Sequence, residues 1–308
     1  MIDRKELKAM AKLRMAQSEP RYWKVMLVWF LAAMVIPNVA VTLGTGPLSR
    51  WYVMINVAGL EAESAWWLLM STTSIALIWL AVVLSVVVTL YQWILNFGFS
   101  AYALRLYRGE PCGPSTLFSG FSMAGRVLGA QLLVLLFTLL WALALMIPLL
   151  VVVAAAALLP EGLMILVFFA AYIAYFVALV VILLRYALVT FALADQPELG
   201  ALGAIRRSKE LMRGYKGSYV LLILSFLGWF LLFIAITMVI VLPVTLGLTF
   251  GMPTIFLEHY MLAEGIITVA LLVGVLPLIL WLQPYMQTTL AGFYDALLPP
   301  VHRELPPL

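Results

Sequence analysis

Residues 164–184 read MILVFFAAYIAYFVALVVILL, an apolar stretch without a charged side chain. The hydrocarbon core of a bilayer is about 30 Å thick, and a helix needs about 20 mostly apolar residues to cross it. The stretch has this length, and it lacks the alternation of apolar and polar residues that is typical of strands in outer-membrane barrels. It therefore predicts a transmembrane helix.

The composition of the whole chain agrees with this interpretation. Hydrophobic residues make up 65% of the 308 residues, charged residues make up 10%, and the mean hydropathy is +1.11. A soluble domain is about half apolar and about one quarter charged. We therefore expect an all-α, polytopic membrane protein with about six transmembrane helices in a single domain, residues 1–308. The apolar runs are Trp23–Val41, Trp66–Leu95, Val127–Leu150, Met164–Leu193, Tyr219–Leu246 and Ile266–Leu282.

The Lys and Arg residues fall almost entirely on one side of the predicted membrane. Cytoplasmic loops retain positive charge, so we expect this side, with both termini, to be cytoplasmic. The net charge of +4 then describes a basic membrane face, and no nucleic-acid partner is expected. The opposite loops carry only Arg50. The cations of the cytoplasmic side include Arg4, Lys5, Lys8, Lys12, Arg14, Arg21, Lys24, Arg105, Arg108, Arg126, Arg206, Arg207, Lys209, Arg213, Lys216 and Arg303.

A threefold pattern runs through the chain. Each odd-numbered span carries a proline near its predicted outer end, and each even-numbered span continues into a polar and aromatic segment that begins at Asn96, Arg185 or Gln283. An amphipathic stretch precedes every odd-numbered span, as expected of a helix that lies in the membrane interface. We predict three helical hairpins, at about 1–110, 111–200 and 201–308; chance similarity between apolar helices is the alternative. The prolines are Pro37, Pro148 and Pro243, and the amphipathic stretches are Leu7–Arg21, Pro114–Arg126 and Leu202–Lys216.

Short motifs between Arg185 and Trp229, together with two near the end of the chain, resemble the DUF975 family of bacterial integral membrane proteins. The resemblance implies a multi-helix protein of the bacterial inner membrane, and it supplies no catalytic residue. The first external loop, Thr42–Ser64, is longer and more aromatic than this pattern requires. The motifs are Leu184-Arg185-Tyr186, Ala194-Asp195-Gln196-Pro197, Ala204-Ile205, Ser208-Lys209, Leu211-Met212, Gly214-Tyr215-Lys216, Ser225-Phe226-Leu227-Gly228-Trp229, Gln283-Pro284-Tyr285 and Phe293-Tyr294.

Arg185 is the residue that most needs an explanation. A charge in an apolar span costs about 2.5 to 3.5 kcal/mol at the helix centre and less near the interface. It is satisfied either structurally, by head groups or by Asp195, Asp295 or Gln283, or as part of an anion site with Lys209 and Lys216.

Several other polar and aromatic residues have two interpretations each. Tyr186 and Tyr285 either pack at the membrane interface or line a polar cavity. Asn96 and Gln283 are expected to form hydrogen bonds between helices, and Asp195 to end the fourth helix. Pro284 is expected to kink the last span, and Trp229 and Tyr294 are expected to pack.

No catalytic motif, cofactor site or metal site is predicted. Cys112 is the only cysteine, and His259 and His302 fall on opposite predicted sides of the membrane. We therefore expect a non-enzymatic protein whose partners are membrane lipids, and whose cytoplasmic side binds an anionic lipid or amphiphile or a membrane or cytoplasmic protein. A small-solute or lipid transporter with a pathway between the hairpins is the alternative, and a structural or assembly factor is a third.

Overall fold

The computed structural model describes residues 3–37, 61, 63–64, 67, 75–250 and 253–299, without the side chains of 75–78, 243–268 and 271–272. These residues form helices and turns, and no strand occurs among them. The predicted all-α class is therefore confirmed. Most of residues 42–64, which are predicted to form an external loop, and His302 and Arg303 in the tail, lie outside the described residues.

Four helical segments are long and apolar enough to cross a membrane, judged on the described residues. A shorter apolar segment, Tyr22–Val35, lies near the N-terminus. The four segments agree with a multi-pass membrane protein, while the full number of six spans stays a prediction. They are Trp79–Arg108, Ala124–Ala156, Glu161–Asp195 and Lys216–Leu242.

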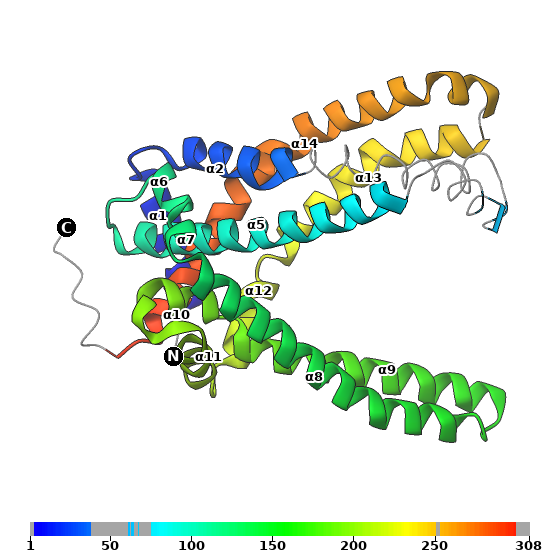
Figure 1. Cartoon of the computed structure of the whole chain (residues 1–308), viewed down its shortest axis with the longest axis horizontal. Coiled ribbons are helices and arrows are strands. Elements are labelled where there is room, and N and C mark those ends of the chain that lie inside the picture. The colour runs from blue at the N-terminus through cyan, green and yellow to red at the C-terminus, as the bar shows by residue number, and fades with distance from the viewer. Residues whose placement is uncertain are drawn as a thin grey trace.

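The N-terminal part lies against the C-terminal helix. Helix α1 (Arg4–Ala16) buries Leu7, Ala11 and Met15, which are four residues apart and therefore share one face. This face packs on α14 (Pro253–Ala296) and α5 (Ile75–Arg108). Helix α2 (Tyr22–Phe30) continues into a π-helical segment, η1 (Leu31–Val35), and also packs on α14. The first and last helices thus meet at one end of the molecule (Figure 1).

Helix α5 is the long helix of the first unit. At 1.5 Å per residue its 34 residues span about 51 Å, well beyond the thickness of the hydrocarbon core. Two short helices, α6 (Pro114–Leu117) and α7 (Ser119–Ser122), pack against it. Gly98 permits this contact, because a Cβ there would lie 1.8 Å from the carbonyl oxygen of Leu117. Helix α5 continues through Gly98 without interruption.

Helices α8 (Ala124–Ala156) and α9 (Glu161–Leu183) pack on each other as consecutive antiparallel partners. Figure 1 shows them as an arm that extends away from α13 and α14. A 3₁₀ turn, η2 (Leu184–Tyr186), follows α9, and α10 (Val189–Asp195) follows η2. Ser208 secures this interruption, since its hydroxyl accepts from Leu188 N at 3.2 Å and donates to Arg185 O at 2.9 Å.

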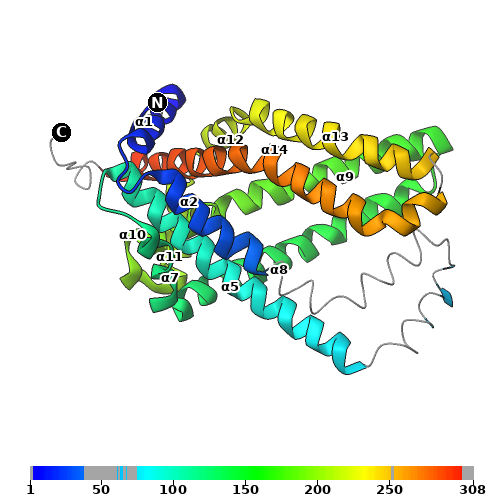
Figure 2. The same ribbon diagram turned by 90° about the horizontal axis from the view of Figure 1, so that it is seen from above.

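The last part contains the longest helix. After η3 (Pro197–Leu199) and α11 (Gly200–Leu211), a turn with Gly214 at φ 86° leads into α12 (Lys216–Leu224) and α13 (Leu227–Phe250). Helix α13 packs along α14, which contains Pro277 and Pro284. The views in Figures 1 and 2 agree that α1, α10, α11 and the ends of α5 and α14 gather at one end, and the helical arms extend from it.

Candidate functional site

Arg185 and Lys209 lie over aromatic rings where η2 and α11 meet α8. The guanidinium carbon of Arg185 is 5.8 Å from the ring centroid of Trp141. The Nζ of Lys209 is 5.2 Å from the ring centroids of both Phe137 and Tyr186. A cation at such distances gains about 0.5 to 1 kcal/mol when exposed and about 2 kcal/mol when desolvated.

Tyr186 is the buried aromatic residue of this arrangement. Its ring stacks on that of Phe137, with 6.4 Å between the ring centroids and 17° between the ring planes. Lys216, at the start of α12, is close enough to Arg185 for the two positive charges to interact. The structure thus brings four of the five predicted binding residues to one region.

Arg185, Lys209 and Lys216, here called the basic cluster, have no acidic partner in contact. Among the described residues, no carboxylate oxygen lies within 4.0 Å of any of the three. Three cations without a counter-charge repel one another, and an anion placed between them would relieve that repulsion. The cluster therefore has the chemistry of an anion site.

The fifth predicted binding residue, Tyr285, makes its contacts elsewhere. It is buried in α14, where its ring centroid lies 5.2 Å from that of Phe226 and 5.0 Å from that of Trp281. Trp229 joins the same group, with its centroid 4.8 Å from Trp281. The Nζ of Lys12 lies 5.3 Å from the Tyr285 ring. These contacts place Tyr285 beside α1.

Lys8 links α1 to the aromatic residues that surround Tyr285. The Nζ of Lys8 lies 4.0 Å from the centroid of Phe226 and donates to Ser225 O at 2.9 Å, at the C-terminal end of α12. Burial lowers the pKa of Lys8, and the charges of Lys12 and Arg4 lower it further. A cation at this helix end also interacts favourably with the helix dipole, so Lys8 has a structural role.

An ionic network that the sequence analysis missed joins the ends of three helices. Arg108 donates from Nη1 to Asp195 Oδ1 at 2.6 Å and from Nε to Asp295 Oδ1 at 2.9 Å. The Tyr294 hydroxyl donates to Asp195 Oδ2 at 3.0 Å. The side chain of Arg108 is 20% exposed and those of the two aspartates are 12% exposed. We call Arg108, Asp195 and Asp295 the ionic clamp.

The clamp corrects the expected pairing of Arg185. Asp195 and Asp295, which were proposed as its partners, are held by Arg108, a residue interpreted only as a marker of the cytoplasmic side. The sequence contained one indication of this network. Each clamp residue lies ten to twelve residues after the first residue of a polar and aromatic segment. The segments begin at Asn96, Arg185 and Gln283. Asp195 is the last residue of α10, as expected of a helix-ending residue.

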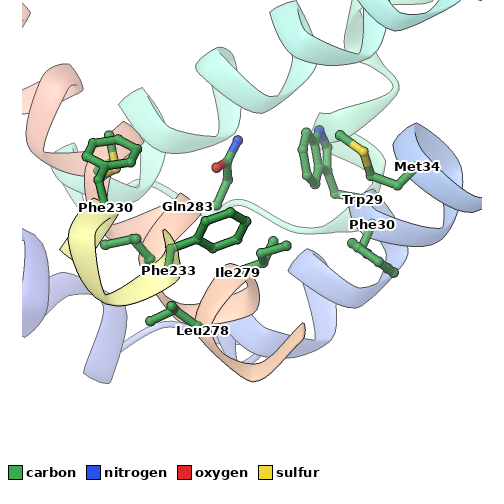
Figure 3. A pocket seen from close by; sticks show the side chains of 10 residues that line it. Trp29, Phe30, Met34, Phe230, Phe233, Leu278, Ile279 and Gln283 are labelled. Carbon is green, nitrogen blue, oxygen red and sulfur yellow. The ribbon is translucent and has the colours of Figure 1, made fainter. Parts of the chain in front are cut away.

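The remaining predicted residues lie at separate places. Asn96 is exposed on α5, and Pro284 is buried within α14. Gln283 and Trp29 both line a cavity of about 290 Å³ between α2, η1, α13 and α14 (Figure 3). Among the described residues, no three His, Cys, Asp or Glu side chains are grouped as a metal site requires.

Comparison with curated proteins and with solved structures found no match. The family model described as "Protein of unknown function (DUF975)" matches residues 1–299. This match covers nearly the whole chain and includes the basic cluster, the ionic clamp and the cavity. The chain therefore belongs to the DUF975 family.

Proposed function

We propose that the protein is a non-enzymatic, multi-pass protein of the bacterial inner membrane that binds an anionic head group, of a lipid or amphiphile, at its cytoplasmic side. In this proposal the chain has six spans arranged as three hairpins, each preceded by an interfacial helix, and both termini are cytoplasmic. The packing of α8 on α9 and of α13 on α14 supports two of the hairpins. The packing of η1 on α5 supports the first.

The basic cluster is the observation that carries the proposal. Its three cations come from η2, α11 and α12, and no carboxylate of the described residues contacts them. Arg and Lys bind phosphate through charge-assisted hydrogen bonds, which are stronger than neutral ones. A phosphate ester would therefore be held by Arg185, Lys209 and Lys216 together.

The neighbouring aromatic residues favour a lipid as the source of this anion. Trp141 is 43% exposed on an apolar face of α8, and Arg185 lies over its ring. Tryptophan and tyrosine concentrate at the level of the lipid head groups. Trp141 would thus mark the height of the interface, and the basic cluster would lie at the depth of lipid phosphates. The alternative partner is a membrane or cytoplasmic protein. Such a protein would bind the basic cluster through an acidic segment.

Transport of a small solute or lipid between the hairpins is the alternative function. The cavity shown in Figure 3 favours it, because it lies between η1 of the first unit and α13 and α14 of the third. Its lining is almost wholly apolar, so an apolar cargo would suit it. Flux of a labelled lipid across proteoliposomes, compared with protein-free vesicles, distinguishes transport from binding alone.

The test of the binding proposal is a count of retained lipids by native mass spectrometry. The variant Arg185→Gln/Lys209→Gln/Lys216→Gln is compared with Lys5→Gln/Arg206→Gln/Arg213→Gln, which removes the same charge from exposed positions. We expect the first variant to lose its preference for phosphatidylglycerol over phosphatidylcholine and the second to keep it. Equal preference in the two variants would refute the site.

A further inference from the structure

The hydrogen-bond donors of the basic cluster are free and accessible. Within the part of the chain that the structure describes, no acceptor takes a hydrogen bond from the side chain of Arg185, Lys209 or Lys216. None of their nitrogen atoms is among the fully buried polar atoms without a partner, so a ligand can reach them. A guanidinium carries five N–H groups and an ammonium carries three. The cluster can therefore bind more than one phosphate group.

Two rings of α8 set the spacing of two of these cations. Arg185 lies over the ring of Trp141, at 5.8 Å from its centroid. Lys209 lies over the ring of Phe137, at 5.2 Å from its centroid. The two ring positions are four residues apart, so they share one face of α8 and are about 6 Å apart along its axis. Neighbouring phosphate groups of one diphosphate can therefore each meet a different cation.

The two cations also lie at different depths. Helix α8 runs from the end of the molecule where α10 and α11 gather to the tip of its arm (Figure 1). Phe137 is about one turn nearer to that end than Trp141 is. With that end on the cytoplasmic side, as proposed, Lys209 lies nearer the cytoplasm and Arg185 nearer the hydrocarbon. A diphosphate ester has the same polarity, because its inner phosphate carries the chain and its outer phosphate is terminal. Cardiolipin instead has its phosphates side by side at one depth.

The charge of the cluster matches a diphosphate better than a phosphodiester. Phosphatidylglycerol carries a single negative charge, so it would leave part of the positive charge of the cluster without a counter-charge. A diphosphate monoester carries about three negative charges near neutral pH, because the second pKa of a terminal phosphate is about 6. Since cations that are not neutralised repel one another, the cluster favours the more highly charged head group.

Apolar surface adjoins the Arg185 end of the cluster. Trp141 is 43% exposed, and Leu140 and Leu183, which lie next to Trp141 and Arg185 in the chain, are exposed as well. In a membrane this surface faces lipid chains. A lipid chain can therefore lie along it while the head group of the same lipid reaches the cations.

We propose that the basic cluster binds a lipid diphosphate, which is a diphosphate ester of a long-chain alcohol. Arg185 and Lys216 hold the phosphate that carries the chain, and Lys209 holds the terminal phosphate. This inference rests on the proposed function, and it names the class of head group that the same site selects.

The experiment compares geranylgeranyl diphosphate with geranylgeranyl monophosphate, which has the same chain and one phosphate. Purified protein is incubated with an equal mixture, and the bound lipids are counted by native mass spectrometry. Because one further charge-assisted hydrogen bond raises affinity by about tenfold or more, we expect wild type to retain the diphosphate over the monophosphate by about that ratio. Equal retention overturns this inference. It leaves the proposed function standing if the site still prefers phosphatidylglycerol over phosphatidylcholine.

Two competitors identify the source of the phosphates. Inorganic diphosphate has the head group without the chain, and cardiolipin has its phosphates at one depth. Each should displace geranylgeranyl diphosphate at least about tenfold less well than the unlabelled lipid diphosphate does, since buried methylene groups contribute strongly to lipid binding. Displacement by either competitor that equals displacement by the lipid diphosphate overturns the assignment.

Two single substitutions locate the terminal phosphate. Lys209 and Arg206 are both exposed on α11, so neither substitution should disturb folding. Lys209→Gln removes the contact to the terminal phosphate and should lower the preference for the diphosphate towards one. Arg206→Gln removes the same charge from the same helix outside the cluster and should keep the preference. A preference that Lys209→Gln leaves unchanged overturns the inference.

Discussion

Replacing Arg108 by Met should destabilise the fold more than any comparable change of a surface arginine. The substitution leaves Asp195 and Asp295 without their shared cation. Because the three side chains are at least four-fifths buried, little of the interaction is screened by solvent. Removing one partner of a buried ion pair costs about 3 to 5 kcal/mol. We expect about 3 kcal/mol, since the Tyr294 hydroxyl still donates to Asp195.

The assay is reversible unfolding in mixed detergent micelles, which reports the free energy of unfolding of each variant. Arg105→Met is the matched control, because Arg105 lies on the same last turn of α5 and is exposed. Exposed substitutions usually stay within about 0.5 kcal/mol. Adding Asp195→Asn and Asp295→Asn to Arg108→Met removes the unpaired charges and should restore part of the loss. If Arg108→Met and Arg105→Met unfold with equal free energies, the clamp does not stabilise the fold.

Three further predictions address packing, reactivity and topology. Gly98→Ala places a Cβ against Leu117 O and should cost about 1 to 3 kcal/mol, whereas Gly125→Ala meets open space and should be nearly neutral in the same unfolding assay. Burial raises the pKa of the Cys112 thiol to about 11, so its thiolate fraction at pH 8 is about 100-fold below that of an ordinary cysteine. The rate at which Cys112 is alkylated should therefore still rise between pH 9 and 10. A rate that reaches a plateau near pH 9 would contradict this. In a Cys112→Ser background, an impermeant reagent added to intact cells should label Glu161→Cys and spare Ser115→Cys and Glu198→Cys; the reverse pattern would invert the topology.

The helices could be predicted from the sequence because apolar runs of span length have few other structures available in a membrane. The basic stretch before the fifth span also forms the expected helix, α11. The 3₁₀ interruption at Leu184–Tyr186 was not predicted. It depends on the hydroxyl of Ser208, which is distant in sequence and reaches η2 only after folding.

The candidate site could be predicted only in part, because some of its contacts join residues that are distant in sequence. Arg185, Tyr186, Lys209 and Lys216 lie close together in the chain, and local folding brings them to one region. Arg108 and Asp295 are 187 residues apart, and nothing local marks them as partners. A charged residue at a helix end usually faces solvent, so the pairing had to come from tertiary packing. Tyr285 was grouped with the basic cluster for its motif, whereas packing places it beside α1.

Photo-crosslinking beside Arg185 tests the central claim most directly. A benzoylphenylalanine at Trp141, whose ring lies under Arg185, is irradiated in nanodiscs that contain labelled phosphatidylglycerol; the same residue at Trp79, exposed on α5, is the control. We expect crosslinks at position 141 that unlabelled phosphatidylglycerol displaces and phosphatidylcholine does not. The substitutions Lys209→Gln/Lys216→Gln should weaken these crosslinks. Equal displacement by the two lipids, or crosslinks equal to those at position 79, would contradict an anionic-lipid site.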